Sequence, residues 1–186
     1  AGADAIVIDS MLAGTGASAE ILLDHSGIPT VPAIVMAREA LRELGLYGKI
    51  SLIASGAIRS GADAAKALAL GADAVAIGIG ALIALNCNKE IPESDFMKEM
   101  GVPAGFCRHC HTGKCPVGIT TQDPALRKKL AGQPEHVINY FFLLAEQLRE
   151  IMASLGFRTV NDMVGRMDRL EAHRALEHWK AKGLDL

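Results

Sequence analysis

Three cysteines lie within nine residues of one another in the second half of the chain. Cys107 and Cys110 are separated by two residues, Cys115 follows after four more, and Pro116 comes directly after it. Thiolates at such short spacings chelate iron or zinc, and a proline directly after the last ligand also occurs in ferredoxin-type cluster motifs. A fourth cysteine, Cys87, stands farther toward the N-terminus. The spacing predicts a metal centre.

The spacing alone does not choose the metal. Structural zinc, with His109 or His111 as the fourth ligand, and an iron–sulfur cluster fit it equally well. Disulfides or plain buried thiols fit less well, because clustered cysteines in a chain of α/β composition are more often metal-binding or redox-active. Zinc and iron therefore both remain open on the residues alone.

Turns rich in glycine and other small residues form a second group of candidates. They cover residues 13–18, 55–61 and 78–81, each directly after an apolar run that predicts a strand. Glycine lets backbone N–H groups approach a phosphate closely, and a helix that begins just beyond such a turn adds its positive dipole end. One such turn is commonplace, whereas three at successive strand ends favour a phosphate-bearing cofactor. Arg59 could add a charged contact to it.

The elements that carry these turns read as repeated strand–turn–helix units. Strands are predicted in 3–10, 50–61 and 72–80, and the stretches "GADAIVI" and "GADAVAI" repeat five of seven residues. Such units predict a parallel sheet with right-handed crossovers. A complete (β/α)8 barrel needs about 250 residues. The first part of the chain is therefore expected to be the C-terminal portion of a TIM barrel.

Past the barrel portion the character of the chain changes. We expect a partial barrel over residues 1–85, a cysteine-rich cluster segment over 86–122 and a helical region over 123–186. In the last region, Asp123 is the expected N-cap of a small helix with Pro124 at its first position. A long amphipathic helix over 134–157 should pack through one face, formed by Phe141, Phe142, Leu144, Leu148, Ile151 and Met152.

Composition excludes several functions. The chain has 186 residues, 50% of them hydrophobic and 4% aromatic, and a formal net charge of −2. That charge gives no global attraction to nucleic acid or to an anionic membrane. No apolar run approaches the ~20 residues that span a bilayer. These features predict a cytoplasmic protein without a nucleic-acid or membrane partner.

Four stretches together carry a family resemblance: "GTGAS", "SGAIRSGADAAKALALGADAVAIG", "ALIALNC" and "CHTGKCPVGITTQ". In this order they resemble the FMN- and iron–sulfur-binding synthase domain of glutamate synthase and its archaeal-type relatives. The resemblance implies an FMN-containing (β/α)8 barrel with a cluster beside it. It also implies an oxidoreductase that passes electrons between cluster and flavin for the reductive amination of 2-oxoglutarate to L-glutamate.

The resemblance also assigns residues by position. Gly14, Thr15, Gly16 and Ala17 would face the flavin and the substrate. The FMN phosphate would be lined by Ser55, Gly56, Ile58, Arg59, Gly78, Ile79 and Gly80. Cys87, Cys110 and Cys115 would match the three ligands of the 3Fe–4S cluster that is usual in this family. No catalytic residue is assigned.

This chain departs from the family pattern in two respects. About twenty residues separate Cys87 from the "CH" pair at Cys110, and Cys107 is an additional thiol, so four cysteines could hold a 4Fe–4S cluster, which we favour slightly. The earlier barrel strands, with a flavin-contacting lysine, and a glutaminase domain that would release ammonia have no counterpart. We therefore expect a missing N-terminal barrel half or a partner chain, and an electron-donor subunit. The alternatives are an electron-transfer module without glutamate synthesis and a zinc-stabilised binding module.

Overall fold

The fold is α/β, with a small parallel sheet and helices. The computed structural model describes residues 2–14, 18–19, 21–22, 25–87, 107 and 109–171. Within them, the strands β1 (Ala5–Asp9), β2 (Ser51–Ser55) and β3 (Ala74–Ala76) form one parallel sheet in the order β1-β2-β3. Parallel neighbours need a crossover, and helices α2 (Thr30–Glu43) and α3 (Gly61–Ala69) lie in the two connections. The predicted parallel sheet is confirmed.

Among the described helices, α2 and α3 cover the same face of this sheet. Leu52 and Ala54 of β2 are fully buried and belong to one core cluster with residues of α2 and α3. The register pairs Ile53 with Val7 and Ala74, and this row of side chains points to the opposite face because side chains alternate along a strand. Val7 is 56% exposed. Within the described part of the chain, the sheet thus has a helix-covered face and an apolar face that no described helix covers, here called the uncovered apolar face.

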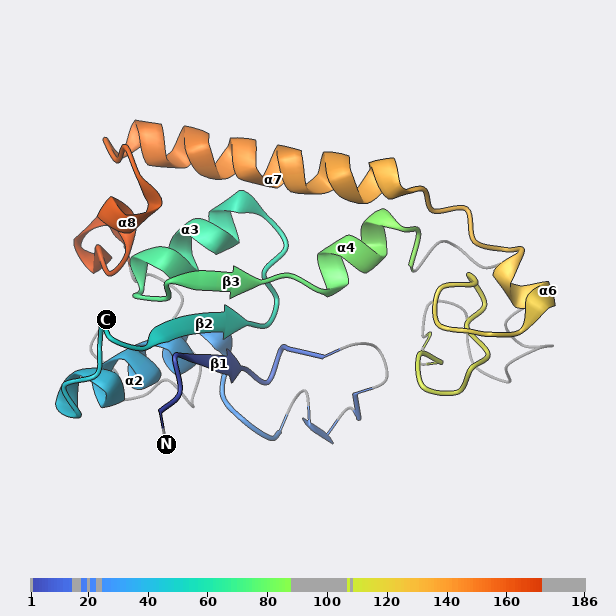
Figure 1. Cartoon of the computed structure of the whole chain (residues 1–186), viewed down its shortest axis with the longest axis horizontal. Helices are drawn as coiled ribbons and strands as arrows, with labels where there is room; N and C mark the ends of the chain where they lie inside the picture. The colour runs from blue at the N-terminus through green and yellow to red at the C-terminus, as the bar shows by residue number, and fades with distance from the viewer. Residues whose placement is uncertain are drawn as a thin grey trace. The chain divides into compact units, whose positions relative to one another are not determined.

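A second layer of helix packs over α3. The long helix α7 (Pro134–Ser154) runs along α3 on the side away from the sheet, and the short helix α8 (Val160–Met163) lies near the C-terminal end of α7 (Figure 1). Leu68 of α3 shares a buried cluster with Met152 of α7 and Met163 of α8. The sheet, α3 and α7 therefore form successive layers held by two adjoining apolar cores.

Two expectations about burial are wrong for the described residues. The apolar, β-branched run in residues 3–10 predicts a buried strand, yet most of β1 is exposed, because it lies at one edge of the sheet. The packing face of α7 includes Leu144, Leu148, Ile151 and Met152 as expected. Phe142 does not belong to it, since its side chain is 73% exposed.

The chain divides into two compact units. One holds residues 1–13, 20–77 and 142–186, and the other holds residues 14–19 and 78–141. The second unit contains α4 (Ile79–Ala84) and α6 (Pro124–Arg127). The predicted N-cap of α6 is confirmed, because the Asp123 carboxylate accepts hydrogen bonds from the N–H groups of Ala125 and Leu126. Among the helices that the structure describes, none combines the length and apolarity that crossing a membrane requires.

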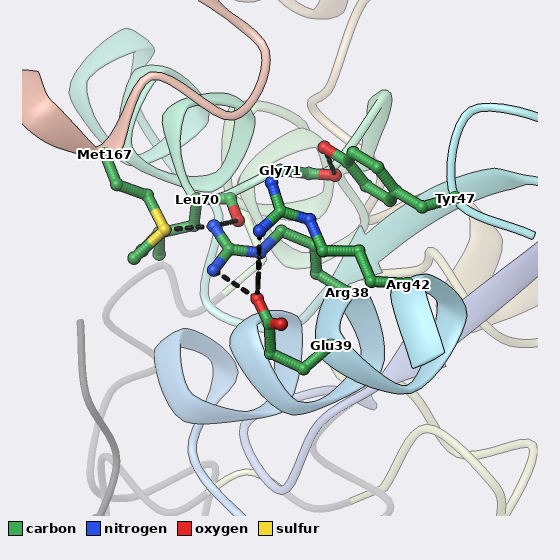
Figure 2. Close-up of polar contacts among 7 residues, drawn as sticks. All are labelled: Arg38, Glu39, Arg42, Tyr47, Leu70, Gly71 and Met167. Atoms are coloured by element: carbon green, nitrogen blue, oxygen red, sulfur yellow. Dashed lines mark hydrogen bonds and ion pairs between the residues drawn. The ribbon is translucent and has the colours of Figure 1, made fainter. Parts of the chain in front are cut away.

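A buried arginine ties α2 to the C-terminal end of α3. The Arg38 side chain is only 7% exposed and its guanidinium donates to the Glu39 carboxylate at 2.6 and 2.9 Å. It also donates to the Leu70 carbonyl oxygen at 3.3 Å and to the sulfur of Met167, in the 3-10 helix η1 (Met167–Arg169) (Figure 2). Because a guanidinium has five donors in a rigid fork, one side chain can serve these three acceptors together.

Candidate functional site

The turn that follows β2 has an unusual backbone. Gly56 has φ +120° and Ala57 has φ +55°. Glycine adopts positive φ easily, but a residue with a Cβ rarely does, and such strain concentrates at functional sites. Beyond the turn, Ser60 caps helix α3 through a reciprocal capping box with Asp63. The turn therefore joins a parallel strand to a helix N-terminus. Contacts with surrounding residues must stabilise its positive φ at Ala57.

Buried hydroxyl groups fill the space beside Gly56. A Cβ at this position would overlap Ser10 Oγ and would lie 3.1 Å from both Thr30 Oγ1 and the Ala13 nitrogen. Thr30 Oγ1 donates to the Gly56 carbonyl oxygen at 2.9 Å. Only glycine fits here, because the position combines a positive φ with neighbours that leave no room for a side chain.

The polar groups at the ends of this turn are already engaged. Ser55 Oγ donates to an Asp9 carboxylate oxygen at 2.6 Å, at the C-terminal ends of β1 and β2. The N–H groups of Arg59 and Ser60 donate to Asp63 Oδ2 at 3.2 and 3.1 Å. An anion at this turn would thus have to be held chiefly by the amides that precede Arg59. The Arg59 side chain is exposed.

An apolar pocket of about 330 Å³ borders the turn. Gly56, Ala57 and Ile58 line one part of it, and Asp63 and Lys66 are its charged lining residues. Ile58 itself is 7% exposed and belongs to the core cluster, so its side chain anchors the turn. The turn is therefore anchored in the core through Ile58 and also borders a pocket. This pocket is large enough to hold part of a small ligand.

The turn after β3 differs in character. Gly78 precedes α4, and apart from its chain neighbours no atom of the described residues lies within 4 Å of the position that its Cβ would take. Ile79 is half-buried at the first position of the helix. A Cβ on Gly80, in contrast, would overlap the Tyr140 hydroxyl. Gly78 thus leaves open space for a ligand, whereas the close approach of Tyr140 is enough to require glycine at position 80.

The first predicted glycine segment is only partly described. Gly14 has φ +97°, and a Cβ there would overlap the Ser18 hydroxyl oxygen, so the backbone requires glycine. Thr15, Gly16 and Ala17 lie outside the described residues. Their assignment to the flavin and substrate side remains a prediction.

The four cysteines all lie in the second compact unit, and none of them forms a disulfide with another described cysteine. The pKa of the Cys107 thiol is raised, chiefly by burial and further by the nearby thiols of Cys115 and Cys110. The Cys107 thiol is therefore near both of the other two thiols. In the parts of the chain that the structure describes, however, no three His, Cys, Asp or Glu side chains form a group that could hold a metal ion. Cys87 follows α4, with its N–H donating to the Leu82 carbonyl.

The loop around Cys115 is built to stabilise a thiolate. Burial alone would raise the pKa of the Cys115 thiol. The backbone N–H groups of Val117, Ile119 and Thr120 outweigh it and lower the pKa below its usual value. The buried Thr120 Oγ1 has no hydrogen-bond partner among the described residues. Sulfur ligands of iron–sulfur clusters accept such N–H hydrogen bonds from their surroundings.

The residues present fit part of each of the two groups that the sequence predicts, although the described cysteines do not form a complete set of metal ligands. Backbone amides and an open glycine suit a phosphate, and thiols with N–H donors around one sulfur suit a metal–sulfur site.

Sequence reasoning missed Asp9, Ser10, Thr30, Ala57 and Asp63. A lone hydroxyl or carboxylate carries no spacing signal, and an alanine gives no sign that its φ will be positive. Only the repeated "GAD" context of Asp63 and the serine three residues before it could have indicated the capping box.

Comparison with known proteins supplies the family. Residues 1–158 match the conserved region in glutamate synthase. The chain is 40% identical over 185 residues to the large chain of glutamate synthase [NADPH] of Bacillus subtilis (strain 168), which covers 99% of this chain and 11% of that protein. It is 44% identical over 158 residues to a glutamate synthase large subunit-like protein of Rhizobium meliloti (strain 1021). That match covers 84% of this chain and 36% of that protein.

An archaeal relative gives the same result. The chain is 41% identical over 172 residues to the archaeal glutamate synthase [NADPH] of Methanocaldococcus jannaschii, covering 90% of this chain and 30% of that protein. The chain thus spans between about a tenth and about a third of the length of these relatives. A match over most of this chain, to several members with identities of 40% or above, establishes kinship rather than a shared fold alone. The chain therefore belongs to the glutamate synthase family.

Proposed function

We propose that this chain is the C-terminal portion of the FMN- and iron–sulfur-binding region of a glutamate synthase. In this proposal residues 1–85 are the end of a (β/α)8 barrel, residues 86–122 the cluster segment and residues 123–186 a helical region. The uncovered apolar face of the sheet supports the barrel, because the inner side of a barrel sheet is filled by side chains from strands on the far side of the barrel. The exposed edge of β1 is where the preceding strand would pair.

The residues that the family resemblance assigns to the FMN phosphate belong to two turns, one after β2 and one after β3. Gly56 and Ile58 would contribute from the first turn and Gly78 and Ile79 from the second, with Arg59 as the cationic partner. The strained backbone at Ala57 and the open space at Gly78 support this assignment. Ser55 would act by holding Asp9 rather than by contacting the phosphate, because its hydroxyl hydrogen is already donated.

One feature carries the cluster proposal: the backbone N–H groups of Thr120, Val117 and Ile119 surround the Cys115 sulfur and lower the pKa of its thiol. A metal ligand must be a thiolate, so this loop stabilises the state that binds. Cys110, Cys107 and Cys87 would be the other ligands of a 4Fe–4S cluster. With Cys107 left out, the remaining three would suit 3Fe–4S.

The proposed reaction is the reductive amination of 2-oxoglutarate by ammonia to L-glutamate. FMN, when bound, would supply hydride transfer, and an iron–sulfur cluster would supply single electrons. The residues of this chain would bind and orient these groups, and ammonia and electrons would come from other parts of the protein or from partners. Reduced nicotinamide nucleotide is the proposed source of electrons, since the names of relatives carry NADPH or NADH.

A visible spectrum of the anaerobically purified gene product that contains this chain tests the proposal. We expect a flavin band and a broad iron–sulfur absorbance that dithionite bleaches, with iron by elemental analysis. A colourless protein with one zinc per chain would instead support the zinc-stabilised module. Flavin and iron without glutamate formation from 2-oxoglutarate and ammonia would support an electron-transfer module.

Single cysteine variants then test the ligands. Cys115→Ser and Cys110→Ser should remove the cluster absorbance while the flavin band stays, because the phosphate turns belong to other segments. Electron paramagnetic resonance of Cys107→Ser decides the cluster type. Loss of a four-iron signal supports Cys107 as a fourth ligand, and an unchanged four-iron signal would remove Cys107 from the ligand set.

A further inference from the structure

Two buried hydroxyl groups form a directed chain of hydrogen bonds that ends on the turn after β2. Ser10 Oγ and Thr30 Oγ1 lie 2.7 Å apart, and Thr30 Oγ1 donates to the Gly56 carbonyl oxygen at 2.9 Å. Ser10 and Thr30 are 8% and 9% exposed. A threonine has a single O–H, and it is used on Gly56, so Ser10 must be the donor to Thr30. The chain therefore runs from Ser10 through Thr30 to Gly56.

Fixing the Gly56 carbonyl also fixes the next amide. In a trans peptide the C=O and the N–H point in opposite directions, and the described residues contain no cis peptide. Because the Gly56 oxygen points toward Thr30, the N–H of Ala57 points away from Thr30. Thr30 thus sets the direction of the Ala57 N–H, although the Thr30 side chain lies on the opposite side of the Gly56–Ala57 peptide.

The backbone conformation explains why such a brace is needed. Ala57 has φ +55°, which an L-residue rarely adopts without support from its surroundings. A rotation of the Gly56–Ala57 peptide would relieve that conformation and would turn the Ala57 N–H toward the core. The absence of a Cβ on Gly56 lets Ser10 and Thr30 come close enough to oppose this rotation.

The direction of the Ala57 N–H matters because Asp63 occupies other donors of the turn. Asp63 accepts the N–H groups of Arg59 and Ser60, so these two donors are not available to a ligand. The donors left for an anion at this turn lie before Arg59, and the Ala57 N–H is the one whose direction Thr30 sets. A phosphate monoester is the ligand class that a turn of backbone amides before a helix suits best.

We propose that Thr30, supported by Ser10, is a positioning residue for the phosphate of the flavin nucleotide: it holds the Gly56–Ala57 peptide so that the Ala57 N–H faces that phosphate. This inference rests on the proposed function, because it takes FMN as the ligand. It adds a residue that lies 26 positions before the turn and acts through the Gly56–Ala57 peptide. Its contribution is confined to the phosphate and does not extend to the isoalloxazine ring.

Riboflavin, which lacks the phosphate, separates positioning from general support of the fold. Dissociation constants for FMN and for riboflavin are measured by flavin fluorescence on the deflavinated gene product that contains this chain. For Thr30→Val, which keeps the shape and removes the O–H, we expect about tenfold weaker FMN binding and unchanged riboflavin binding, since one hydrogen bond to a charged group is lost. Thr30→Ser keeps the hydroxyl and should restore most of the FMN affinity.

Two further variants keep the test decisive. Thr159→Val removes the N-cap hydroxyl of α8, far along the chain, so it should lower stability without changing the ratio of the two constants. If Thr30→Val does not fold, Ser10→Ala takes its place, and it should lower the FMN-to-riboflavin preference by a smaller factor. If the tested variant folds and its preference for FMN over riboflavin equals that of the wild type, the inference is overturned. A wild-type protein that binds neither flavin would overturn the proposed function itself.

Discussion

The backbone N–H of Gly61 donates a hydrogen bond of 2.7 Å to the side-chain oxygen Oε1 of Gln147, across 86 residues of sequence. Gly61 is the first residue of α3, where N–H groups have no partner within the helix. A side chain of α7 therefore completes the N-terminus of α3. The relationship links the turn that follows β2 to the long helix near the end of the described chain.

Replacing Gln147 tests the value of this bond. Gln147→Met keeps the length of the side chain but leaves the buried Gly61 N–H without its acceptor, which should lower the free energy of unfolding by about 1–2 kcal/mol. Gln147→Glu retains an acceptor and should cost less. Urea denaturation followed by circular dichroism measures both. Equal losses for the two variants would show that the hydrogen bond has no net value.

Gly61→Ala should be more damaging than a typical glycine-to-alanine change. The new Cβ would lie 2.5 Å from the Leu148 nitrogen and 2.7 Å from the Leu144 carbonyl oxygen, so the backbone of α7 would have to move. Overpacking of this kind costs about 1–3 kcal/mol, and more where backbone cannot yield. Gly78→Ala is the matched control, because its Cβ would meet nothing within 4 Å. Similar melting temperatures for both variants would argue against close packing of α3 and α7.

The Arg38 contacts predict a difference between two neighbouring arginines. Arg38→Lys keeps the charge but replaces the planar fork by a single ammonium, which cannot serve Glu39, the Leu70 carbonyl and Met167 together. We expect a loss of about 1–2 kcal/mol, from a buried carbonyl left without its donor. Arg42→Lys, at a side chain that is 51% exposed and 3.5 Å from the same carboxylate, should be nearly neutral. Thermal denaturation compares the two.

The Cys115 thiol predicts a pH dependence of the metal-free protein. Its pKa is lower in the folded state than in the unfolded chain, so the folded state binds fewer protons at intermediate pH and stability rises with pH. The contribution is fully present above the unfolded value of about 8.5 and disappears as the pH falls through the folded value. The stability difference between wild type and Cys115→Ser should therefore grow as the pH is raised from about 6 to about 9. A difference that is constant over this range would contradict the assigned thiolate.

Local signals predicted the elements well. Asp123 followed by Pro124 predicted the start of α6, and short β-branched runs predicted the three parallel strands. Burial was predicted less well. An apolar pattern does not reveal what covers a segment, so β1 and Phe142 are predicted as core from the sequence although both are exposed.

Only part of the candidate site was accessible to sequence reasoning. Glycines at strand ends identified the turn after β2, but they gave no sign that the carbonyl of Gly56 is held by Thr30. Such a contact depends on how α2 returns across the sheet, and no spacing rule encodes it. Gly80 shows the same limit of sequence reasoning. Its close packing against Tyr140 explains the glycine without any contact to a phosphate.

The discontinuous first unit has a consequence for biosynthesis. Leu68 of α3 is covered by Met152 and Met163, which leave the ribosome only after about ninety further residues have been added. At translation rates of about 5–20 residues per second, this face of α3 stays uncovered for roughly 5–20 s. During that interval the nascent chain carries an apolar helix face whose partner does not yet exist. We therefore expect chaperones that recognise exposed apolar segments to engage the chain before α7 emerges.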